Sequence, residues 1–96
     1  MYQRVDLLSN GSATGSGQRW DGGRGSFLVN GTFDGETVTL QVLGPDGTTY
    51  VDVGTDAALT ANGVANFDLP QGMIRAAVST GGGSPTGLYA IAVSIP

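Results

Sequence analysis

Three runs of β-branched and aromatic residues, separated by two tight turn sequences, constrain this chain most strongly. The runs are Phe27–Phe33, Glu36–Leu43 and Thr49–Val53, and the turns are Asp34-Gly35 and Pro45-Asp46-Gly47. An Asp-Gly pair accepts positive φ at both central positions of a two-residue hairpin turn. Pro-Asp-Gly favours a turn that ends in a left-handed residue. The sequence therefore predicts a short antiparallel meander over residues 27–53.

The same alternation of apolar and polar residues recurs along the rest of the chain. Six of the 17 glycines stand in Asn-Gly or Asp-Gly turn pairs such as Asn62-Gly63, and no stretch has a helical period. This pattern predicts an all-β fold, an antiparallel β-sandwich that is jelly-roll-like or immunoglobulin-like, with seven or eight short strands. The further expected strands are Arg4–Leu8 (a strand or an ordered arm), Ala57–Thr60, Val64–Leu69, Met73–Ser79 and Leu88–Ile95.

The length of 96 residues allows a single domain. Within it we expect an N-terminal strand or arm with a Gly/Ser-rich loop (residues 1–24, the loop covering 9–24) and a sandwich core (residues 25–96). The strand Leu88–Ile95 is apolar on both faces, so we expect it in the middle of a sheet. The expected core residues are Phe27, Val29, Phe33, Val38, Leu40, Val42, Val51, Val53, Phe67, Leu69, Ile74, Val78, Ile91 and Val93.

The composition excludes several kinds of chemistry. The chain has no His, Cys or Lys, so it has no Ser-His or Cys-His pair, no Schiff-base lysine and no usual zinc ligands. We therefore expect no enzymatic activity, no cofactor and no metal. Four Arg against 8 Asp and Glu leave a net charge of −4, which disfavours nucleic acid as a partner. No signal-peptide pattern opens the chain and no apolar run reaches the length of a membrane span, so we expect no membrane partner.

Two weaker alternatives involve carboxylates. Asp52 and Asp68 could serve as the acid and base of a glycosidase, although exposed strand residues, one of them paired with Arg75, are the preferred interpretation. Asp52, Asp56 and Asn62 could supply oxygen ligands to calcium, but their spacing matches no known calcium loop. Turn-forming Asp and Asn residues are expected in such a fold in any case.

The segment Gln18–Arg24 holds the only Trp and two of the four Arg residues. Trp and Arg are enriched at interface hot spots, so Arg19, Trp20 and Arg24 are candidate partner-binding residues. The alternative is that Trp20 folds back over one end of the sandwich while the arginines are solvated. The N-terminal segment, with Tyr2 and Arg4, is expected to extend the contact surface.

The stretch from Gly25 to Thr48, with the later pieces Asp68-Leu69-Pro70, Arg75–Val78 and Leu88–Val93, resembles small virion proteins of tailed bacteriophages. The resemblance implies a head-associated protein, a decoration or cement protein on the capsid exterior whose partner is the major capsid protein. It implies no catalytic residues. Because cement proteins sit at symmetry positions, self-association as a dimer or trimer is also expected.

Two other functions remain open from the sequence. One is a carbohydrate- or receptor-binding module of a phage tail or fibre, with Trp20, Tyr2 and Tyr50 as stacking platforms. The other is a structural subunit of the tail or neck.

Overall fold

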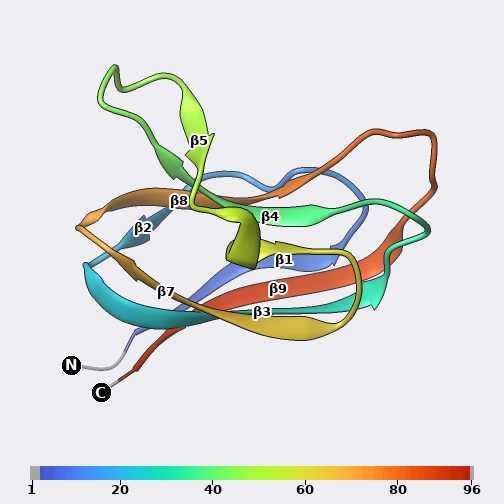
Figure 1. Cartoon of the computed structure of the whole chain (residues 1–96), viewed down its shortest axis with the longest axis horizontal. Coiled ribbons are helices and arrows are strands. Elements are labelled where there is room, and N and C mark those ends of the chain that lie inside the picture. Colours follow the sequence, from blue (N-terminus) through green and yellow to red (C-terminus); the bar gives the residue numbers. More distant parts are fainter. Residues whose placement is uncertain (1–2, 96) are drawn as a thin grey trace.

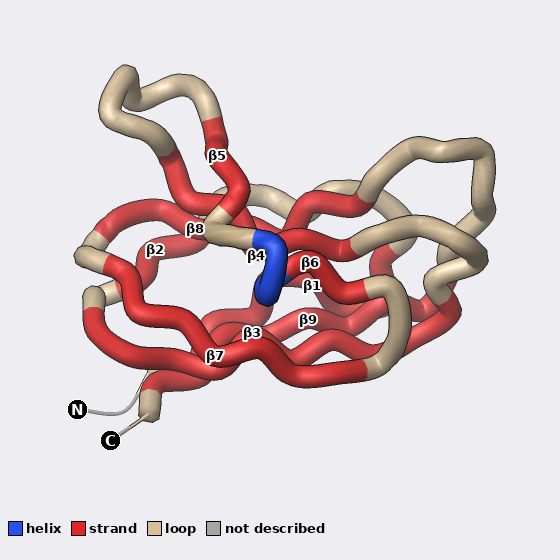
Figure 2. Tube along the Cα trace, in the orientation of Figure 1, coloured by secondary structure: helices blue, strands red, loops and turns tan. Residues whose placement is uncertain are grey.

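The computed structural model describes residues 3–95, which form two antiparallel β-sheets packed face to face (Figure 1). Strands and their connections make up nearly all of this part of the chain, with one short 3-10 turn, η1 (Thr55–Ala57) (Figure 2). The predicted antiparallel β-sandwich is confirmed, with nine strands in residues 3–95 instead of seven or eight. One sheet has four strands in the order β1 (Arg4–Gly11), β9 (Thr86–Ser94), β3 (Gly23–Thr32) and β7 (Gly63–Leu69). The other sheet has the order β2 (Gln18–Trp20), β8 (Gly72–Val78), β4 (Val38–Leu43) and β5 (Tyr50–Asp52). A short fifth strand of this second sheet, β6 (Ala58–Leu59), also pairs with β4.

The strand pairing is that of one long hairpin rolled into two layers. The first strand pairs with the last, β2 with β8, β3 with β7, and β4 with β6. Rolling this hairpin places β9 beside β3 in one sheet and β8 beside β4 in the other. Of the two predicted sandwich types, this connectivity is the jelly roll. The expected central position of the last strand is confirmed, because β9 lies between β1 and β3.

The Asp34-Gly35 turn has the predicted backbone but a different role. Asp34 and Gly35 both have positive φ, 49° and 85°, and the Glu36 N–H donates to the Phe33 carbonyl at 3.0 Å. The strands on either side nevertheless lie in different sheets, so the turn carries the chain across the sandwich. The predicted meander is therefore wrong at its first turn and correct at its second, where β4 and β5 pair as a hairpin.

The second turn is held by the side chain of Asp46. Its carboxylate accepts hydrogen bonds from the N–H groups of Thr49 and Thr48, both at 2.9 Å, and from the Thr49 hydroxyl at 2.7 Å. These bonds, that of the Thr49 N–H first, favour the ionised form and lower the pKa of Asp46 to about 2. Gly47 takes the left-handed position with φ 76°, as predicted. In Figure 1 this hairpin projects away from both sheets.

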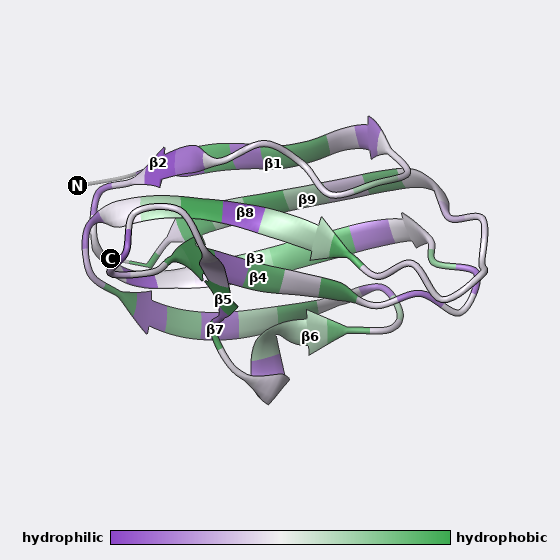
Figure 3. Ribbon diagram, turned by 90° about the horizontal axis from the view of Figure 1, so that it is seen from above, coloured by the Kyte–Doolittle hydropathy of each residue, from purple (hydrophilic) through white to green (hydrophobic). Residues whose placement is uncertain are grey.

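Hydrophobic and hydrophilic residues alternate along the strands (Figure 3), and the buried apolar residues form one core between the sheets. Val42, Val53 and Leu69 pack against the core while partly buried. Three predicted core residues lie elsewhere: Val51 is 46% exposed, and Ile91 and Val93 lie on the outer face of their sheet. Predicted residues that are fully in the core are Phe27, Val29, Phe33, Val38, Leu40, Phe67, Ile74 and Val78.

The last strand shows why the core prediction failed there. Its inward residues are Leu88, Ala90 and Ala92, all of which are fully buried between the sheets. The larger residues Tyr89 and Ile91 are on the other side of the strand. Because both faces of this strand are apolar, the sequence alone could not show which face is turned inward.

The Gly/Ser-rich segment predicted as a loop is largely built into the sheets. Strand β1 continues to Gly11, β2 covers residues 18–20 and β3 begins at Gly23. Between them, the Gly15 N–H donates to the Ala76 carbonyl at 3.0 Å, and the Val78 N–H donates to the Thr14 hydroxyl at 3.0 Å. Residues 14–20 therefore line the edge of β8.

Candidate protein-binding surface

Trp20 is a core residue, not a surface contact. It is 0% exposed at the end of β2, and its ring lies 5.1 Å from the ring of Phe67, tilted by 60°. The structure therefore supports the alternative in which Trp20 closes one end of the sandwich. A side chain without exposed surface cannot touch a partner, so we remove Trp20 from the candidate contact residues.

Gly25 makes room for this aromatic pair. A Cβ at residue 25 would lie 2.6 Å from Phe67 Cζ and 2.8 Å from Trp20 Cη2. Both distances are far below van der Waals contact, so the two rings leave room only for a glycine at residue 25 of β3. This pairing of Gly25 with Trp20 is a packing constraint that no local sequence pattern signals.

Arg4 and Arg24 project from the outer face of the β1-β9-β3-β7 sheet and Arg19 from the outer face of the other sheet, but their backbones lie at the same end of the sandwich. We call this the arginine end. Gln3 ties it together, because its side-chain amide donates to the Arg19 carbonyl and accepts from the Asp21 N–H, both at 2.9 Å. The Arg24 carbonyl accepts from the N–H of Ile95 at 2.9 Å. Tyr2, the remaining predicted contact residue, lies outside the described residues.

The guanidinium groups at this end are held only loosely. Arg19 Nε lies 3.1 Å from Asp21 Oδ1 and Arg4 Nε lies 3.4 Å from Asp6 Oδ1. Both pairs are exposed, and pairs of this kind contribute at most about 1 kcal/mol. Arg24 makes no ion pair within residues 3–95. All three side chains are therefore free to form new contacts at little cost, on a backbone that is fixed.

The fourth arginine has a structural role. The guanidinium carbon of Arg75 lies 4.1 Å from the ring centroid of Tyr50, and Arg75 Nε donates to Gln41 Oε1 at 2.8 Å. Gln41 Nε2 in turn donates to Asp52 Oδ1 at 2.9 Å. The sequence predicted that Asp52 or Asp68 pairs with Arg75, and in the structure Gln41 links Arg75 to Asp52. The cation covers one face of the Tyr50 ring, so that face is not free to stack against a ligand.

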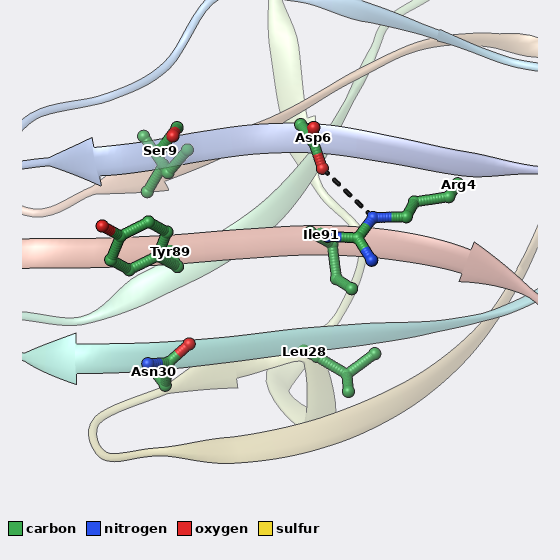
Figure 4. Close-up of a pocket in the computed structure, with 8 residues that line it drawn as sticks. Arg4, Asp6, Ser9, Leu28, Asn30, Tyr89 and Ile91 are labelled. Atoms are coloured by element: carbon green, nitrogen blue, oxygen red, sulfur yellow. Dashed lines mark hydrogen bonds and ion pairs between the residues drawn. The ribbon is translucent and has the colours of Figure 1, made fainter.

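The outer face of the sheet formed by β1, β9, β3 and β7 carries a shallow hollow of about 410 Å³ (Figure 4). Tyr89, 45% exposed, stands in the middle strand between Ser9 of β1 and Asn30 of β3. Ile91 and Leu28 continue the floor. Tyr89 is an exposed aromatic residue that the sequence analysis did not single out.

The carboxylates considered for catalysis are not paired. Asp52 lies in β5 of one sheet and Asp68 in β7 of the other, where it faces Arg24 across the strands. Asn62, considered with Asp52 and Asp56 as a calcium ligand, accepts the N–H of Gly31 at 2.9 Å. Within residues 3–95 no group of three or more Asp or Glu side chains is placed to hold a metal ion.

Glu36 is a buried carboxylate that the sequence analysis did not single out. It is 2% exposed and accepts the Ser79 hydroxyl at 2.6 Å and the N–H groups of Gly81 and Gly83 at 2.7 Å. These bonds, the hydroxyl first, lower the pKa of Glu36 against the opposing effect of burial. Glu36 thereby fastens the glycine-rich 80–83 loop to the Asp34-Gly35 turn.

No helix within residues 3–95 is long and apolar enough to cross a membrane.

Comparisons with known proteins show the fold and no family. No protein-family model matches the chain, and no curated protein matches it. Among solved structures, the chain is similar to the crystal structure of the SPBc2 prophage-derived protein YomS, with a TM-score of 0.65 and 14% sequence identity. The likeness covers 98% of this chain and 94% of that chain. The two chains therefore share one fold over nearly their whole lengths.

Proposed function

We propose that this chain is a non-enzymatic bacteriophage structural protein, a decoration or cement protein that binds the major capsid protein on the capsid exterior. The arginine end carries this proposal. Three of the four Arg residues of an acidic chain lie there, on a backbone pinned by Gln3. Arginine is enriched among residues that dominate protein interfaces, and a fixed backbone lowers the entropy lost on binding.

Two further observations support a virion role. The jelly roll recurs in viral capsid domains, although the fold alone does not determine function. The similar structure, YomS, is described as prophage-derived, which agrees with a phage origin for this chain. A protein repeated over a shell can use weak individual contacts, because multiplicity supplies the affinity.

The test uses particles that lack the chain. Heads and complete virions from a phage strain with the gene deleted are mixed with the purified protein and sedimented. We expect the protein to sediment with heads, and a gold-labelled copy to lie over the shell in negative-stain images. Label confined to the tail would favour the tail or neck subunit, and the absence of binding to any particle would refute a virion role.

A charge-matched pair of variants tests the arginine end. The change Arg19→Ala with Arg24→Ala removes two positive charges there, whereas Ser12→Asp with Thr60→Asp adds two negative charges in exposed bends. Both variants have a net charge of −6, because 2 − 8 and 4 − 10 are equal. We expect only the arginine variant to lose occupancy on heads. Equal occupancy of both variants would exclude the arginine end as the contact.

A second candidate is the carbohydrate- or receptor-binding module, and the hollow around Tyr89 is the observation that favours it. Its exposed ring is flanked by Asn30 and Ser9, which can hydrogen-bond to hydroxyl groups. A glycan array with the wild-type protein and Tyr89→Ala separates the two functions. Sugar binding that the variant loses would favour this module, and an array without signal would leave the capsid role.

A further inference from the structure

The outer face of the β1-β9-β3-β7 sheet has an apolar row across its middle. The registers pair Ile91 with Leu28, and Leu28 with Val64, so these three residues form one line across three strands. We call this line the apolar row. Val64 is 60% exposed, and no part of residues 3–95 covers it. The solvent face of an antiparallel sheet is usually polar, so an apolar row there points to a partner.

The charges on this face indicate which partner. It carries four charged residues, Arg4, Asp6, Arg24 and Asp68, whose charges cancel. The other two Arg and the other six acidic residues therefore account for the whole net charge of −4. Copies of an acidic protein repel one another through most of their surface, but not through a face with no net charge. A second copy of this chain fits these properties.

We propose that two copies associate face to face through this sheet, about a two-fold axis that runs parallel to the strands between β9 and β3. Such an axis places β1 over the partner's β7 and β9 over the partner's β3. Ile91 then faces Leu28 of the partner subunit. Arg4 approaches Asp68 of the partner subunit on the diagonal, and Asp6 lies over Val64 of the partner subunit.

The size of the face sets the strength of the dimer. Four strands about 4.8 Å apart and about six residues long give a face of about 20 × 20 Å, which buries about 800 Å² over both copies. Stable interfaces bury about 1,200–2,000 Å². The dimer is therefore expected to be weak in dilute solution, with a dissociation constant between about 10 µM and about 1 mM. The isolated protein tests this inference separately from the proposed capsid role, although the dimer face and the arginine end share Arg4 and Arg24.

The experiment is sedimentation equilibrium of the whole chain from about 10 µM to about 1 mM, the range that brackets such an affinity. The test variants are Val64→Asp and Val64→Arg. The controls are Val51→Asp and Val51→Arg, since Val51 is also exposed, 46%, but lies in the other sheet. Each control has the net charge of its test variant. Far-UV circular dichroism checks that all four variants fold.

The two Val64 variants are expected to behave in opposite ways. Val64→Asp places a carboxylate over Asp6 of the partner subunit and weakens the dimer by about tenfold or more. Val64→Arg places a cation there and keeps the dimer, as do both Val51 controls. A wild-type protein that stays monomeric at about 1 mM would overturn the proposal. So would a dimer that survives Val64→Asp, or one that both Val64 variants abolish.

Discussion

Replacing Trp20 with alanine tests whether this side chain supports the fold, as the structure indicates. The side chain is fully buried and packs against Phe67. Truncation of a buried Trp to Ala costs about 3–5 kcal/mol. The buried Nε1 of Trp20 has no hydrogen-bond partner within residues 3–95, and its removal returns part of that cost. We therefore expect a net loss somewhat below this range, about 2–3 kcal/mol.

This loss is large for a domain of 96 residues, whose free energy of unfolding is about 5–14 kcal/mol. With a urea slope of about 1 kcal/mol per M, the unfolding midpoint falls by about 2–3 M. Far-UV circular dichroism is the appropriate probe, because the variant loses the only Trp and its fluorescence. The matched variant Trp20→Phe keeps a ring against Phe67 and removes the unpaired N–H. Its expected loss is smaller than that of Trp20→Ala, because less apolar volume is removed from the core.

Two results would contradict this reasoning. An alanine variant with the wild-type midpoint and slope would show that Trp20 does not support the fold. A phenylalanine variant as unstable as the alanine variant would show that contact with Phe67 is not what stabilises this end of the sandwich. The expected order of midpoints is wild type, then Trp20→Phe, then Trp20→Ala.

Three further outcomes follow from the structure. Gly25→Ala overpacks the site beside Trp20 and costs about 1–3 kcal/mol in thermal unfolding, and an unchanged midpoint would refute the steric argument. The pKa of Glu36 is lowered in the fold from 4.5, so its stabilisation is complete above about pH 4.5 and is lost as the pH falls through the folded pKa. Glu36→Gln should therefore lower the urea midpoint at pH 7 and flatten its decline in acid, whereas parallel pH profiles would contradict this. Asp46→Ala removes the acceptor of the Thr49 N–H and should speed hydrogen exchange at that amide, while unchanged protection would show that the turn holds without it.

The arginine end was only partly predictable from the sequence. Arg19 and Arg24 stand five residues apart, so their proximity follows from the chain itself. Arg4 joins them only because β1 pairs with the last strand and Gln3 bonds to the Arg19 carbonyl. The sequence did not determine whether Trp20 is exposed or buried, because an aromatic residue among glycines can either contact a partner or cover one end of the sandwich. Its burial depends on Phe67, which is 47 residues further along the chain.

The sequence by itself determined where the strands lie and how the chain turns between most of them. Alternation of side chains and the φ preferences of Asp-Gly and Pro-Asp-Gly are local properties, so the Asp34-Gly35 turn has the predicted backbone. The tertiary structure alone decided which strands pair. Arg4 lies beside Val93, and a turn suited to a hairpin instead joins two sheets. The reason is physical: a turn sets the direction of the chain, but the sheet that a strand joins depends on which distant apolar faces it can bury.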